Sequence, residues 1–125
     1  MSLILDTGAL LSVERNDRDV LALLKAQILA RRIPLTHGGV VGQVWRGGSR
    51  HAAVARLLRA VTIAALDEDL GRRAGLLLGR ARRTDVVDAA IVSLAVDGDW
   101  ILTSDPDDLR ALAKAAGTHV ELIPV

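Results

Sequence analysis

The sequence predicts an α/β fold, a three-layer α/β/α sandwich around a central, mostly parallel sheet of about five strands. Short apolar runs alternate along the chain with longer segments whose apolar residues recur at helical spacing. Strands separated by helices need long crossovers, which parallel sheets require and hairpins do not. A chain of 125 residues has the length of one ordinary domain, so we expect a single domain over residues 1–125.

The first half of the chain begins with an apolar run that ends at Asp6-Thr7-Gly8, which is typical of a buried strand leading into a turn. A helix follows, and then a longer amphipathic helix for which either Asp17 or Asp19 is a suitable N-cap. Gly38-Gly39 and Gly47-Gly48 bound a further helix. The predicted elements are strand 2–5, helix 9–14, helix 19–32, strand 33–36 and helix 40–46.

In the second half, Ser49 is the expected cap of the next helix, and Asp67-Glu68-Asp69 place negative charge at the start of another. Asp105-Pro106 is a helix-start signal, with Asp at the N-cap and Pro at the first helical position. The predicted elements are helix 49–59, strand 61–66, helix 67–83, helix 85–96, strand 100–103, a helix from residue 106, and strand 120–125.

Charge is segregated along the chain, although the net charge is only +1. Residues 20–66 hold seven basic residues and no acidic one, whereas the segments on either side are net acidic. This pattern favours an anionic partner for the middle of the chain and a cation for the flanking carboxylates. The alternative is that most of these arginines lie along helix faces with their heads in water.

Composition excludes several classes of site. The chain has no cysteine, and its three histidines lack paired ligand spacing, which argues against disulfides, thiolate nucleophiles and zinc. Two tryptophans are the only aromatics, so contact with nucleic acid is expected to be mainly electrostatic. The longest nearly apolar stretch, residues 89–96, is too short to span a membrane, and no signal peptide is apparent, so we expect a cytoplasmic protein.

Carboxylates follow two of the predicted strands, Asp6 after the first and Asp105 after the fourth. Between them, the helix 85–96 is apolar all round except for Asp88 and Ser93, and an ionised carboxylate on such a helix is costly unless it is paired or binds a metal. Each acid has a structural alternative: Asp6 suits a turn, Asp85 and Asp105 suit N-caps, and Asp88 stands at the third helical position of a capping arrangement with Asp85, which is a poorer fit. Together they favour a magnesium or manganese site, whose bound water can attack a phosphodiester.

Three motifs resemble those of PIN-domain ribonucleases, specifically VapC-like toxins of type II toxin–antitoxin systems. They are Leu5-Asp6-Thr7-Gly8-Ala9-Leu10, Asp88-Ala89-Ala90-Ile91-Val92 and Thr103-Ser104-Asp105-Pro106-Asp107. The resemblance implies a Mg²⁺- or Mn²⁺-dependent endoribonuclease that acts as a toxin. By motif, Asp6, Asp88 and Asp105 are then the catalytic, metal-binding residues. Four further side chains are candidates to support the ligands or to join them: Gln43, Asp85, Thr103 and Asp107.

The chain departs from that family at two positions. Gln43 stands where the family has a glutamate, and Gly8 stands where it more often has serine. A glutamine keeps a carbonyl ligand but loses the charge, which is expected to weaken metal binding or to favour a single ion. The alternative function is therefore a PIN-like module that binds RNA or its antitoxin without efficient cleavage.

The resemblance also implies partners: an RNA substrate, a cognate antitoxin that covers the helical surface from Ala9 to Ala30, and a second copy of the toxin. Arg46 and Arg50 are the best candidates for RNA binding within the basic segment. A third class, phosphotransfer at an acidic pocket, needs an aspartate at Gly8 and a lysine directly after a strand. The chain has neither, so this alternative is poor.

Overall fold

The computed structural model describes residues 1–125, apart from the side chain of Arg50. Its five strands form one sheet in the order β3-β2-β1-β4-β5, and every neighbouring pair is parallel. The predicted α/β sandwich with five parallel strands is thus confirmed. The strands are β1 (Leu3–Leu5), β2 (Leu35–His37), β3 (Thr62–Ala64), β4 (Trp100–Thr103) and β5 (Glu121–Pro124).

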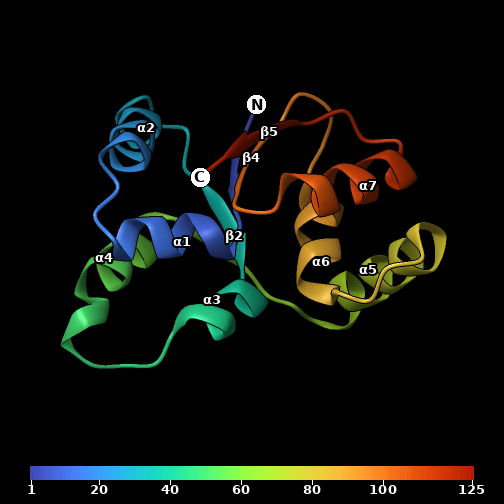
Figure 1. Cartoon of the computed structure of the whole chain (residues 1–125). Coiled ribbons are helices and arrows are strands. Elements are labelled where there is room, and N and C mark those ends of the chain that lie inside the picture. The colour runs from blue at the N-terminus through green and yellow to red at the C-terminus, as the bar shows by residue number, and fades with distance from the viewer.

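Helices cover both faces of the sheet (Figure 1). On one side α1 contacts α2, α3 and α4, and on the other α5, α6 and α7 contact one another. The helices are α1 (Thr7–Glu14), α2 (Arg18–Leu29), α3 (Gly38–Val44), α4 (Ala52–Ala60), α5 (Glu68–Ala81), α6 (Val86–Leu94) and α7 (Pro106–Ala116), with a 3₁₀ turn, η1 (Ser49–His51), before α4.

The central strand β1 is entirely buried and supplies the middle of the core. Its Ile4 pairs with Leu35 of β2 on one side and with Ile101 of β4 on the other. Such strands, covered by helices on both faces, are expected to be uniformly apolar rather than alternating. β1 has this character, whereas β2 and β3 also carry polar residues.

Two of the predicted caps, Ser49 and Asp105, make no capping hydrogen bond, although Asp105 holds the predicted N-cap position. Asp17, rather than Asp19, caps α2, Asp67 caps α5 and Asp85 caps α6. Ser49 does not cap a helix: it lies within η1, and neither η1 nor α4 has a side-chain cap. The predicted strand 33–36 is shifted to residues 35–37, because Pro34 has no amide hydrogen for the ladder.

The chain order of the strands reverses at β1, with β2 on one side of it and β4 on the other. In open parallel sheets such a switch point leaves a crevice beyond the carboxyl ends of the two diverging strands. Residues that directly follow β1 and β4 therefore share one edge of the sheet. No helix among the described residues is long and apolar enough to cross a bilayer.

Candidate metal centre

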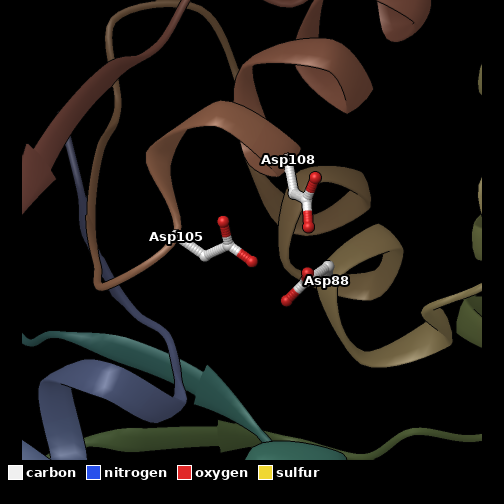
Figure 2. A group of neighbouring side chains, drawn as sticks. All are labelled: Asp88, Asp105 and Asp108. Atoms are coloured by element: carbon white, nitrogen blue, oxygen red, sulfur yellow. The ribbon is translucent and has the colours of Figure 1, made fainter.

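Three carboxylates converge at the switch point (Figure 2). Asp105 follows β4, Asp108 lies in the first turn of α7, and Asp88 lies in the first turn of α6. One oxygen from each lies within 4.8 Å of the others. Carboxylate oxygens gathered in this way are the ligands that Mg²⁺ and Mn²⁺ prefer.

Asp6 lies near this group, since its charge acts on Asp88 and Asp105, and both of its carboxylate oxygens accept hydrogen bonds. Its side chain is 4% exposed, and it accepts hydrogen bonds from the Thr7 amide (2.7 Å) and from the Thr103 hydroxyl (2.9 Å). The Thr103 hydroxyl oxygen in turn accepts from the Asp105 amide (2.9 Å). Thr103 thus links the carboxylate after β1 to the backbone after β4.

The pKa values of these acids are raised, which shows that their surroundings disfavour the ionised carboxylates. Burial is the main cause that raises the pKa of Asp88 to about 7, and the negative charges of Asp6, Asp85, Asp105 and Asp108 raise it further. Burial also raises the pKa of Asp6, although its bonds from Thr7 and Thr103 oppose the shift. Burial and the neighbouring Asp108 raise the pKa of Asp105. A bound cation would favour the ionised form of every one of these groups.

The predicted residue Asp107 does not join the group. Its side chain is 90% exposed and pairs with Arg110 of the same helix at 2.7 Å. Asp108, which was not among the predicted site residues, faces the group instead. The signal for it was available, because residues four apart share a helix face and Asp108 precedes the buried Leu112 by four.

Asp105 and Asp85 differ although both occupy N-cap positions. The Asp105 side chain makes no capping hydrogen bond, so its carboxylate is available to a ligand. The Asp85 side chain accepts from the amides of Val87 and Asp88 (2.9 and 3.1 Å). Asp85 therefore fixes the helix turn that carries Asp88, and it also lines a cleft with Asp88 and Asp108.

Gln43 lies beside residue 7 rather than within the acidic group. Its Oε1 accepts a hydrogen bond from the Thr7 hydroxyl, which joins α3 to the start of α1 next to Asp6. Gly8 is explained by packing: a Cβ at this position would lie 2.6 Å from the Ser104 Cβ and 2.7 Å from the Ser104 amide nitrogen. The loop after β4 can approach α1 only because residue 8 has no side chain.

His37 helps to position the first turn of α6, which carries Asp88. This role was not predicted from the sequence. His37 is fully buried at the end of β2, and its Nδ1 accepts from the Gly39 amide (3.0 Å). Its Nε2 therefore carries the proton and donates to the Val87 carbonyl oxygen (3.0 Å). Burial lowers the pKa of His37, which keeps the ring neutral and joined to the first turn of α6.

The basic segment is only partly described. Arg46 is exposed just beyond α3 and donates to the carbonyl oxygens of Gly42 (3.2 Å) and Trp45 (2.8 Å). The guanidinium thus binds carbonyl oxygens at the C-terminal end of α3. The side chain of Arg50 lies outside the described part of the chain.

A second feature is an apolar groove of about 540 Å³ formed by α1, α2 and α4. Two basic side chains, Lys25 and Arg56, lie at it, and the described residues that line it include no acidic one. Its apolar lining comprises Val13, Leu21, Leu24, Ile28, Leu29, Ala53, Leu57 and Ala60.

Comparison with known proteins identifies the fold. No family model and no curated protein sequence matches the chain. Among solved structures, a chain in the crystal structure of VapBC2 from Rickettsia felis, bound to a DNA fragment from its promoter, is similar with a TM-score of 0.70. The match covers 98% of both chains at 9% sequence identity. The fold predicted from the resemblance to VapC-like PIN domains is confirmed.

Proposed function

We propose that this protein is a Mg²⁺- or Mn²⁺-dependent endoribonuclease, the toxin of a toxin–antitoxin pair, built as a single PIN-like domain over residues 1–125. The observation that carries the proposal is the convergence of Asp88, Asp105 and Asp108 beside the buried Asp6. A likeness in fold to a VapBC2 chain supports it. RNA as the substrate implies action in the cytoplasm.

The residues fit a hard divalent cation. Every charged donor in the group is a carboxylate, and a pKa of about 7 for Asp88 means that the group does not hold its full negative charge alone near neutral pH. Asp88, Asp105 and Asp108 would hold the ion, with Asp6 as a further ligand. When bound, a Mg²⁺ or Mn²⁺ ion supplies an activated water and stabilises negative charge on the phosphate.

The chain's own residues orient this chemistry. Thr103 and the Thr7 amide fix both oxygens of Asp6, so this carboxylate is presented in one orientation. Asp85 and His37 anchor the first turn of α6 and hence the position of Asp88. Fixed supports around the ligands are a common requirement of metal sites, because small displacements change the affinity strongly.

The antitoxin partner is proposed to bind in the groove between α1, α2 and α4. An apolar groove of this size suits an amphipathic segment, and Lys25 and Arg56 favour acidic residues beside its apolar face. This agrees with the expectation that the antitoxin covers the surface from Ala9 to Ala30. Homodimerisation, and RNA binding by Arg46 and Arg50, are further parts of the proposal that rest on the resemblance and on the charge pattern.

One observation favours the second candidate function, binding without efficient cleavage. Gln43 contributes no charge, and its Oε1 is engaged by Thr7. If the proposed enzyme needs a carboxylate there, turnover will be weak although RNA and antitoxin still bind.

Cleavage of a mixed tRNA and rRNA pool by purified, antitoxin-free protein tests the proposal. Discrete fragments that form with Mn²⁺ or Mg²⁺, and that are absent with chelator and with Asp6→Asn, support the nuclease. Binding of the same RNA without metal-dependent fragments supports the second candidate. If neither binding nor cleavage is seen across the pool, the nuclease and RNA binding by the second candidate are both rejected.

A further inference from the structure

Arg83 is the one described basic side chain that forms an ion pair with the acidic group. Its Nη1 lies 3.3 Å from the Asp108 Oδ1. The other three ion pairs among the described side chains each join residues three or four apart in one helix. Only Arg83–Asp108 connects two elements, the α5–α6 loop and α7.

The backbone of Arg83 is held by a hydrogen bond, whereas its side chain is about half exposed. The preceding residue, Arg82, has a left-handed conformation (φ 55°) that ends α5, and the amide of Arg83 donates to the Leu78 carbonyl oxygen (3.1 Å). The side chain of Arg83 is 45% exposed. The loop therefore directs the side chain toward α7 without enclosing it.

The ion pair is a loose one. Its 3.3 Å separation is longer than the 2.7–3.1 Å of the other three. A guanidinium has five N–H donors, and this contact is the only hydrogen bond from the Arg83 side chain to the described residues. Most of its donors remain available to a second anion.

The surroundings of Arg83 point to that anion. Arg83 lines a cleft of about 300 Å³ together with Asp85, Asp88 and Asp108. Asp88 and Asp108 belong both to this cleft and to the proposed cation site, so a phosphate that approached the cation from this side would enter the cleft. An Arg fork matches two oxygens of a phosphate, and a guanidinium is well suited to a group with spread negative charge.

We propose that Arg83 is a phosphate-binding residue of this centre: it pairs with Asp108 when the carboxylates hold no cation, and turns to a phosphate oxygen of the ligand when they do. The inference rests on the proposed function, because it requires a cation at the acidic group. If so, the presence of Arg83 lowers the affinity of the acidic group for a cation and raises its affinity for phosphate.

The test measures both effects in Arg83→Gln. Mn²⁺ is titrated into metal-free protein by electron paramagnetic resonance, and inorganic phosphate is then titrated into the Mn²⁺-loaded protein by ³¹P line broadening. Loss of a nearby positive charge is expected to tighten Mn²⁺ binding roughly threefold or more. Loss of a charge-assisted hydrogen bond is expected to weaken phosphate binding roughly tenfold.

Two variants serve as controls. Arg110→Gln removes the same charge from the exposed pair with Asp107 and is expected to change neither affinity. Arg83→Lys keeps the charge but loses the fork, so its Mn²⁺ affinity should stay near that of the wild type while phosphate binding recovers in part. Thermal unfolding of each variant checks that the fold is retained.

The outcomes distinguish failure of the Arg83 proposal from failure of the proposed metal site. If the wild type binds no Mn²⁺, the metal site is rejected and the inference falls with it. If the wild type binds Mn²⁺ but Arg83→Gln has unchanged phosphate affinity, or binds Mn²⁺ more weakly, the inference alone is overturned and the metal site stands.

Discussion

Replacing Asp88 by asparagine should change how the stability of the metal-free protein depends on pH. Burial, with the charges of four nearby aspartates, raises the pKa of Asp88 from its ordinary value of 3.8 to about 7. A carboxyl with a higher pKa in the folded than in the unfolded protein costs stability as the pH rises through the interval between the two values. The wild type should therefore lose stability from about pH 4 to about pH 7, and Asp88→Asn should lose less.

The size of the effect follows from the interval between the two pKa values. Each unit corresponds to about 1.4 kcal/mol, so the step from 3.8 to about 7 sets a ceiling of roughly 4 kcal/mol. Asp88 is partly exposed, and screening by solvent reduces this to about 1–2 kcal/mol. We expect Asp88→Asn to be more stable than the wild type by that amount at about pH 8 in chelator, and nearly equal to it at about pH 4.5.

Urea unfolding at the two pH values measures this difference, with chelator present throughout. Asp107→Asn is the matched control, because it removes an exposed acid that does not belong to the acidic group. Saturating Mn²⁺ at the higher pH should stabilise the wild type and narrow the gap to Asp88→Asn. An Asp88→Asn protein that is equal to the wild type or less stable at the higher pH in chelator would refute the reasoning.

Three other predictions concern neighbouring positions. Thr103→Val leaves Asp6 without one of its hydrogen bonds, so the free energy of unfolding measured in urea should fall by about 1–3 kcal/mol and RNA cleavage should be slower. Thr103→Ser keeps the hydroxyl and should retain both the stability and the cleavage rate. Gly8→Ala forces the Ser104 loop away and should lower the free energy of unfolding by about 1–3 kcal/mol. Gly42→Ala meets no atom within 4 Å and should leave the stability unchanged or raise it. Equal melting temperatures for the two variants would contradict this. Gln43→Glu adds a negative charge near Asp6 and should tighten Mn²⁺ binding roughly threefold or more; an unchanged titration would mean that residue 43 lies too far from the ion.

The fold and part of the acidic group could be predicted because both depend on local pattern. Buried parallel strands are short apolar runs, and their carboxyl ends meet at one edge of the sheet, which was enough to bring Asp6 and Asp105 together. Asp88 stands out in the sequence because a carboxylate is exceptional on an apolar helix, and the structure places it in the acidic group. These inferences needed only the order of the elements and the apolar composition of one helix.

The remaining features depend on how helices are rotated and packed against one another. Asp108 faces the group and Asp107 faces solvent because of the way α7 is rotated about its axis. The order of the strands does not determine that rotation. Gly8 depends on a close approach between α1 and the loop after β4, and His37 depends on the contact between β2 and α6. Arg83 lies twenty-five residues from Asp108 in sequence, so only the tertiary structure brings the two together.

The most direct test of the central claim compares two adjacent carboxylates. Rates of Mn²⁺-dependent RNA cleavage are measured for the wild type, Asp108→Asn and Asp107→Asn under identical conditions. If Asp88, Asp105 and Asp108 hold the ion, Asp108→Asn should slow cleavage by roughly a hundredfold while Asp107→Asn cleaves at the wild-type rate. Equal rates for the two variants, or loss of cleavage only in Asp107→Asn, would contradict the proposed centre.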